Sequence, residues 1–180
     1  MATENATRPR LSGDERRALF IEAAITEFGA RGYHATRTTD IARRAGVTQP
    51  YLYALFPDKR SLFLACHERT TALIRQTLRD AANAEDPDDG LELNARIGRA
   101  VTRMTESHPQ YLRFYFQARA AAATDPDIRA TVRRNFMAIV DDSVELHGAP
   151  RQEVLRYIAW AMLHDVAVAL DLPADYRPQI

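Results

Sequence analysis

The segment from Ile41 to Leu55 combines an apolar framework with polar and aromatic side chains that stay free for binding. Five apolar positions are spaced to pack a small support, namely Ile41, Ala42, Val47, Leu52 and Leu55. The side chains that this packing leaves exposed are Thr48, Gln49, Tyr51 and Tyr53. Hydroxyl and amide groups on one rigid helix can contact base edges in the major groove of DNA, which is wide enough to admit a helix. The pattern therefore predicts a DNA-reading segment.

Two short helices joined by a glycine turn must position these side chains. We expect the first at about 37–45, with Thr36 as its N-cap, and the second from Thr48 to about Phe56, after a turn at Gly46. Pro50 is tolerated in the second helix because amides of the first turn have no intrahelical partner. An amphipathic helix that starts at a capping box over Ser12–Glu15 and ends at Gly32 would brace both. This arrangement is a helix-turn-helix.

Helical periodicity continues through the rest of the chain, without a strand pattern or a repeat. Asp58 can cap a long helix, and prolines stand where later first turns should begin. The expected helices cover residues 59–82, 91–106, 109–123, 126–146 and 151–170. Residues 85–90 indicate an exposed acidic loop, and residues 173–180 a loosely held tail. The sequence predicts an all-α fold, with a three-helix helix-turn-helix domain at 1–58 and a five-helix ligand-binding and dimerisation domain at 59–180.

Three stretches of the N-terminal third form one combined pattern. They are Ala23-Ala24 with Phe28 and Gly32-Tyr33, then Thr36 with Asp40-Ile41-Ala42 and Ala45-Gly46-Val47, then Gln49-Pro50-Tyr51-Leu52-Tyr53 with Phe56, Lys59 and Leu62-Phe63. Over residues 12–66 this combination resembles the DNA-binding domain of the tetracycline-repressor (TetR) family. The chain departs from the family at Ala54 and Leu55, where many members carry an aromatic residue and a histidine. One backbone contact is therefore missing or supplied elsewhere.

The resemblance implies a DNA-binding role for nine residues. Gln49 and Tyr51 look like base-edge readers, while Tyr53 and Lys59, the only lysine of the chain, look like phosphate contacts. The whole expected set is Thr36, Thr38, Thr39, Thr48, Gln49, Pro50, Tyr51, Tyr53 and Lys59. Packing residues remain the alternative for Tyr51 and Tyr53. Arg43 and Arg44 fit a solvated face better than base reading.

The last helix is apolar on two sides, so it needs two partners. The resemblance implies that the last two helices pair with their copies in a homodimer, which places two recognition helices about 34 Å apart on a palindromic operator. The residues expected at this dimer interface are Val132, Ile139, Val140, Leu155, Ile158, Met162, Leu163 and Val166.

Residues 111–116 form the densest aromatic cluster of the chain and are candidates to line a pocket for a small hydrophobic effector. The expected lining residues are Met104, Tyr111, Phe114, Tyr115, Gln117, Phe136, Trp160 and His164. An ordinary core is the alternative. An effector that prefers a conformer with misplaced recognition helices would release the operator, with the helix at 59–82 as the lever. No cofactor and no metal site are expected.

The chain has zero net charge, but residues 1–60 hold ten Lys or Arg against seven Asp or Glu, which suits a local anionic partner. The single cysteine, Cys66, excludes an intramolecular disulfide, and no apolar run is long enough for a membrane span. We therefore expect a cytoplasmic regulator. The alternatives are an activator, a helical module that binds protein, and an enzyme; against the last, the five histidines are scattered and His164-Asp165 has no recognised metal-ligand spacing.

Overall fold

The computed structural model describes residues 12–84 and 92–177, and this part of the chain is all-α, as predicted. Its helices are α1 (Gly13–Ala35), α2 (Thr38–Arg44), α3 (Gln49–Leu55), α4 (Lys59–Ala82), α5 (Leu93–Ser107), α6 (Pro109–Thr124), α7 (Pro126–His147) and α8 (Arg151–Ala169). A 3-10 turn, Ala174–Tyr176, follows α8 and was not predicted. The described residues contain no helix long and apolar enough to cross a membrane. The expected acidic loop at 85–90 lies outside the described residues, as do the chain's first eleven residues and the end of the expected tail.

Local capping sets where the two longest N-terminal helices begin. Ser12 and Glu15 form the predicted capping box, in which each side chain accepts a hydrogen bond from the backbone of the other residue. Asp58 accepts from the Ser61 amide at 2.6 Å and starts α4 at the predicted residue. Thr48 is the N-cap residue of α3, as predicted, but its side chain makes no capping hydrogen bond. The prediction for Thr36 is wrong, because the N-cap of α2 is Arg37.

Gly32 bends α1 instead of ending it. Its backbone has φ 75° and ψ 173°, after which one further helical turn runs to Ala35. A side chain at this position would be strained, because positive φ disfavours a Cβ. A Cβ here would also lie only 2.8 Å from Oε1 of Gln117 on α6.

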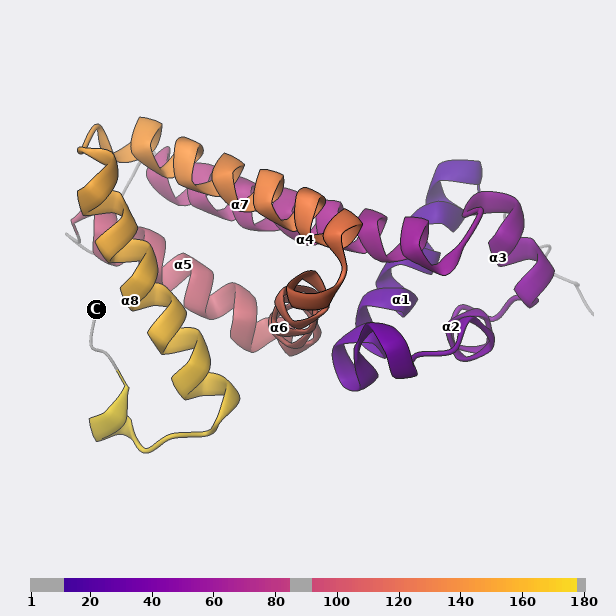
Figure 1. The fold of residues 1–180 in the computed structure, drawn as a ribbon. Helices are drawn as coiled ribbons and strands as arrows, with labels where there is room; N and C mark the ends of the chain where they lie inside the picture. The colour runs from indigo at the N-terminus through magenta and orange to yellow at the C-terminus, as the bar shows by residue number, and fades with distance from the viewer. Residues whose placement is uncertain (1–11, 85–91, 178–180) are drawn as a thin grey trace, which may run out of the picture.

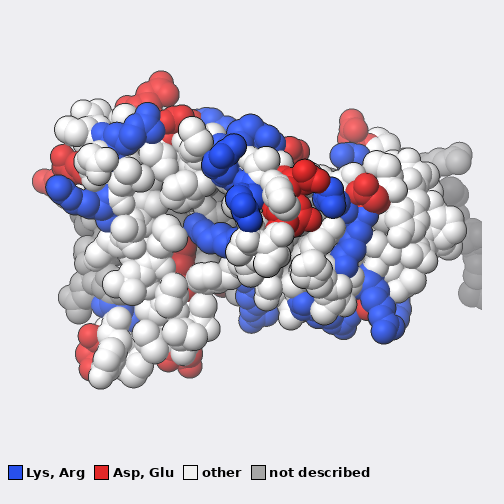
Figure 2. All heavy atoms as spheres, viewed as in Figure 1, with Lys and Arg blue, Asp and Glu red and all other residues white. Residues whose placement is uncertain are grey.

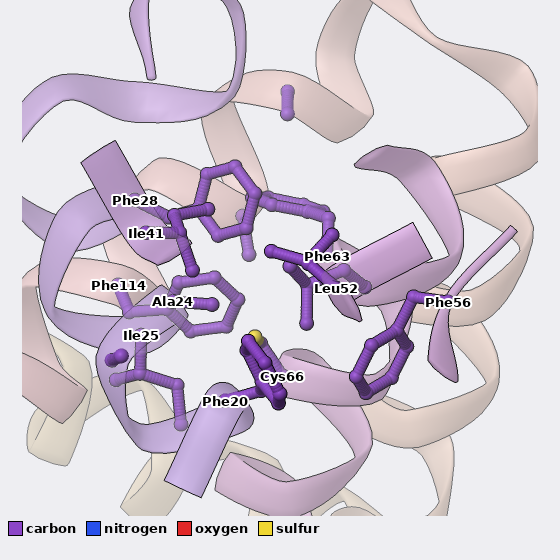
Figure 3. Packing of buried hydrophobic residues seen from close by; sticks show 14 of the residues in the cluster. Phe20, Ala24, Ile25, Phe28, Ile41, Leu52, Phe56, Phe63, Cys66 and Phe114 are labelled. Atoms are coloured by element: carbon purple, nitrogen blue, oxygen red, sulfur yellow. The ribbon is translucent and has the colours of Figure 1, made fainter. Parts of the chain in front are cut away.

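The helices α1, α2 and α3 gather at one end of the molecule, where α1 packs on α4 and α6 (Figure 1). Side chains from all five helices meet in one aromatic core (Figure 3). Phe63 of α4 lies at its centre, with its ring 4.9 Å from that of Phe28 and 5.1 Å from that of Phe114. The end formed by α1, α2 and α3 is therefore joined to α4 and α6 through one hydrophobic core.

The long helix α4 runs from this core along α7 to the far end of the molecule (Figure 1). Asp142 on α7 fixes the pair, because it accepts two hydrogen bonds from Arg75 at 2.7 and 2.8 Å and one from Arg79 at 2.6 Å. These contacts hold the pKa of the Asp142 carboxyl below its ordinary value. A second apolar cluster around Leu78 and Ile97 joins α4 to α5 and α7.

Candidate nucleic-acid interface and ligand cavity

One side of α3 is open to solvent. Thr48, Pro50 and Tyr53 are exposed, and Tyr53 keeps 43% of its surface accessible although it is a large aromatic residue. Leu52 on the opposite side is fully buried and anchors the helix in the aromatic core. Thr39 on α2 is also exposed. An anchored helix with a polar and aromatic outer side is what insertion into a DNA groove requires.

A hydrogen-bonded chain of three side chains joins α2 to α3. Nε2 of Gln49 donates to Oγ1 of Thr38 at 2.8 Å, and the same Oγ1 lies 3.1 Å from the phenol oxygen of Tyr53. Thr38 itself is buried. Its hydroxyl therefore orients the two α3 side chains from beneath, a role that sequence reasoning did not anticipate.

Tyr51 is half-buried and is held from α1. Nη1 of Arg16 donates to its phenol oxygen at 2.9 Å, and its ring lies 5.9 Å from that of Phe20. This environment favours the packing alternative for the ring of Tyr51, although part of the side chain remains accessible.

Lys59 and Thr36 occupy different environments at the start of α4 and the end of α1. The ammonium of Lys59 donates to the carbonyl of His34 at 3.1 Å and lies 5.0 Å from the centre of the Tyr33 ring. Partial burial lowers the pKa of Lys59. Thr36 is only 2% exposed, and its hydroxyl donates to carbonyls of α1. This burial corrects the expectation that the Thr36 side chain contacts DNA.

Most arginines near α2 already have acidic partners. Arg44 pairs with the buried carboxylate of Glu27 at 2.6 Å, and Arg31 pairs with Asp40 at 2.8 Å. Arg37, at the N-cap of α2, is exposed and has no ion pair with any described residue. Sequence reasoning did not single out Arg37 as a candidate, although a basic residue between Thr36 and Thr38 was a visible signal.

A cavity of about 110 Å³ lies between helices α4 to α8. Its wall includes six of the predicted effector residues: Met104, Tyr111, Tyr115, Phe136, Trp160 and His164. The two others lie elsewhere, which corrects that expectation. Phe114 is fully buried in the aromatic core, and Gln117 faces Gly32 of α1.

Besides hydroxyl groups of threonine, serine and tyrosine, the wall of this cavity carries a guanidinium, an imidazole and a carboxyl group: Arg119 from α6 and His164 and Asp165 from α8. Burial raises the pKa of the Asp165 carboxyl to about 6, against an opposing effect of Arg119. Both ring nitrogens of His164 are buried and have no hydrogen-bond partner among the described residues. The sequence signal for Asp165 was a lone acid inside an apolar helix. No described group of three or more His, Cys, Asp or Glu side chains could hold a metal ion.

The outer face of α8 is apolar and open. Leu163 is 55% exposed, and Met162 and Val166 lie beside it with more than a third of their surface accessible. Leu155 and Ile158 are half-buried, Val132 packs partly on the aromatic core, and Ile158 lines the cavity. Ile139 and Val140 are already buried within the single chain, which corrects their expected place at a dimer interface.

Comparison with known proteins agrees with this geometry. Residues 20–66 match the model of the family described as bacterial regulatory proteins, tetR family. The transcriptional activator FasR of Mycolicibacterium smegmatis is 34% identical over 141 residues, which cover 76% of this chain and 61% of FasR. The chain thus spans less than two thirds of this relative's length.

Solved structures extend the likeness to the whole architecture. A TetR-family protein from Streptomyces coelicolor superimposes with a TM-score of 0.72 at 19% identity, over 90% of this chain and 92% of that one. A TetR-like regulator from Rhodococcus gives 0.68 at 23% identity, over 93% and 91%. With the matched segment containing α2, α3 and their support, the chain belongs to the tetR family of bacterial regulatory proteins.

Proposed function

We propose that the chain is a ligand-responsive transcriptional repressor that binds a palindromic operator as a homodimer and leaves it when a small hydrophobic effector binds. The observation that carries this proposal is the exposed side of α3, which Leu52 anchors and the Thr38 hydroxyl aligns, inside the segment that matches the tetR family. The proposed site of action is the cytoplasm.

The proposed DNA contacts divide by chemistry. Gln49 and Thr48 at the start of α3 read base edges, since the Gln49 amide keeps an acceptor and one further donor after bonding Thr38. Tyr51 adds ring contact through the part that is not buried, and Pro50 adds apolar contact. Thr39, Tyr53, Lys59 and Arg37 bind phosphates and fix the register on the duplex.

The proposed dimer uses the open face of α8. Exposed apolar patches of this kind mark protein interaction sites, and a second copy of the same face would cover Met162, Leu163 and Val166. Leu155, Ile158 and Val132 flank that contact. A symmetric pair presents two copies of α3, which is what two half-sites of a palindrome need.

The proposed effector occupies the cavity between α4 and α8. Its wall is mostly apolar and carries few polar groups, as in other small-molecule sites. An effector releases DNA only to the extent that it binds the DNA-incompetent conformer more tightly than the competent one. Side chains of α4 form part of both the cavity wall and the aromatic core, so α4 is placed to connect the two.

Activation of transcription is the second candidate function, because FasR, the 34% identical relative, is named as an activator. Both functions use the same DNA contacts. They differ in the sign of the transcriptional effect, which depends on where the operator lies relative to the promoter.

The test is fluorescence anisotropy with a duplex from the promoter of the protein's own gene, followed by transcription in vitro from that promoter. Gln49→Ala should lower operator affinity roughly 5- to 150-fold, while Arg103→Gln on the exposed side of α5 should leave it unchanged. Reduced transcription that an effector restores supports repression, and increased transcription supports the activator. Equal affinity of the wild type for operator and scrambled duplex contradicts both functions and favours a protein-binding module.

A further inference from the structure

A second hollow lies beside the cavity, between α6 and α7, and we call it the arginine groove. Its volume is about 210 Å³. The residues that line it are His67, Tyr115, Arg119, Ala122, Arg129, Val132, Arg133 and Phe136. Three of these residues are arginines and none is acidic, so the groove carries concentrated positive charge. Figure 2 shows basic side chains over α7 with acidic side chains between them.

Two of the three guanidinium groups form no ion pair among the described residues, although the Asp165 carboxyl is near enough to interact electrostatically with Arg119. Neither Arg119 nor Arg133 forms an ion pair with a described carboxylate, whereas the neighbouring Arg134 pairs with Glu68. Arg119 instead lies 3.7 Å from the centre of the Tyr115 ring. Arg129 donates to the carbonyls of Ala122 and Ala123 at 2.8 Å, which fixes it against the end of α6. The groove therefore keeps two cations available to a ligand.

His67 on α4 adds a buried donor to the groove wall. The ring is only 1% exposed, and its Nδ1 lies 2.8 Å from the amide nitrogen of Asn135. An amide nitrogen can only donate, so Nδ1 accepts and the proton resides on Nε2. Nε2 is buried and has no partner among the described residues. Burial and the nearby charges of Arg119 and Arg134 lower the pKa of His67 to about 4, so the ring is neutral at pH 7. An unsatisfied buried N–H is rare in folded proteins and calls for an acceptor.

The arginine groove and the apolar cavity share part of their walls. Tyr115, Arg119 and Phe136 line both. Arg119 belongs to this shared wall, so its guanidinium can contact the polar end of a molecule whose apolar part lies in the cavity. Asp165 belongs to the cavity wall and not to the groove, and its raised pKa reflects an environment unfavourable to a second negative charge deep in the cavity. The anionic end is thus favoured on the groove side of Arg119.

We propose that the effector is an amphiphile with an apolar body and an anionic end, a carboxylate or phosphate, and that Arg119, Arg133 and His67 bind this anionic end in the arginine groove. The inference rests on the proposed function, because it assigns a chemical class to the effector of that function. Charge-assisted hydrogen bonds from guanidinium to carboxylate or phosphate provide the recognition.

The test compares molecules of equal chain length and different end groups by isothermal titration calorimetry at pH 7.5. The probes are decanoate, decanol and decylamine below their aggregation limits, with inorganic phosphate as the free anion. Decanoate should bind on the order of tenfold more tightly than decanol, because only the carboxylate gains charge-assisted bonds. The double variant Arg119→Gln with Arg133→Gln should bind decanoate no better than decanol, while its affinity for decanol stays as in the wild type.

Arg103→Gln is the matched control, since it removes one exposed arginine from α5 outside both hollows and should keep the preference for decanoate. Four results overturn the proposal: equal binding of decanoate and decanol, tightest binding of decylamine, phosphate binding as tightly as decanoate, or an undiminished preference in the double variant. Operator binding without any ligand is measured in parallel. If the wild type does not bind the operator, the proposed function is contradicted. If it binds the operator but shows no preference for decanoate, only the proposed effector class is contradicted.

Discussion

The phenol of Tyr111 on α6 donates a hydrogen bond to the carboxylate of Glu22 on α1, with each carboxylate oxygen 2.7 Å away. Tyr111 also lines the cavity. Burial and the carboxylate of Glu22 raise the pKa of the phenol, so it remains a protonated donor. One side chain therefore contacts both the proposed effector site and the helix that braces α2 and α3.

Replacing Tyr111 by Phe should weaken communication between effector and DNA. The variant keeps the ring in the cavity wall but loses the hydrogen bond to α1, so the effector should reduce operator affinity several-fold less than in the wild type. The measurement is operator affinity with and without the compound that gives the largest thermal shift in a screen of small hydrophobic molecules. Tyr157→Phe is the control, because Tyr157 also lines the cavity but bonds Asn94 on α5. Equal losses in the two variants would argue against a specific role of Tyr111.

Replacing Thr38 by Val should lower operator affinity by about tenfold, which corresponds to about 1.4 kcal/mol. The buried hydroxyl that aligns Gln49 and Tyr53 would be absent, although Thr38 itself is not exposed. Anisotropy titration measures the effect. Thr26→Val removes a hydroxyl that bonds only a carbonyl of α1 and should leave the affinity as it is. Unchanged binding in the Thr38 variant would show that Gln49 and Tyr53 need no such support.

Replacing Leu163 by Asp should convert the proposed dimer to a monomer. A charge at this 55% exposed position would be desolvated in the proposed α8 interface, while it costs little on a free surface. Light scattering after gel filtration measures the mass, and operator affinity should fall at least about tenfold because two half-sites no longer bind together. Leu19→Asp on α1, at a 50% exposed position, is the control and should stay dimeric. A dimeric Leu163 variant would place the interface elsewhere.

Replacing Asp165 by Asn should stabilise the ligand-free protein above pH 6. The folded-state pKa of about 6 exceeds the ordinary value of 3.8, so the folded chain holds a proton that the unfolded chain releases between these two values. Wild-type stability contributed by this group is therefore present below pH 4 and is lost as the pH rises through 6. The difference in the free energy of unfolding between the Asn variant and the wild type should grow by about 1–3 kcal/mol between pH 4 and pH 6. Denaturation with urea from pH 4 to pH 8 measures it, and Asp175→Asn, which is exposed, should show no such growth.

Local signals in the sequence were sufficient to predict where the helices lie and which segment reads DNA. Asp58 and Ser12 determine helix starts through bonds to residues three positions away, and the prolines at 109 and 126 stand in first turns as expected. The apolar residues Ile41 and Leu52 were sufficient to identify the buried sides of α2 and α3, because short-range periodicity decides which side of a helix is buried.

The residues that line the cavity could not be predicted from helical periodicity alone. Phe114 and Tyr115 are neighbours in one aromatic run, yet one enters the core beside α1 and the other the cavity wall. The position of α1 against α6 decides between them, and this packing joins residues about ninety positions apart. Arg119 and Asp165 were missed for a related reason, since a charged residue on a helix usually faces water.

Gly29 shows how closely α1 and α6 approach, because a Cβ there would lie 3.1 Å from both the carbonyl oxygen of Gln110 and the amide nitrogen of Phe114. The turn at Pro57-Asp58 separates helices α1 to α3 from the later helices along the chain. In space, however, the surfaces of α1 and α6 interlock around Gly29. An exchange of the DNA-reading unit between two relatives would therefore fail if the crossover were made at residue 58 alone. A working chimera must transfer the matching turns of α6, residues 110–121, together with the reading unit, so that specificity can be transplanted only with its complementary surface.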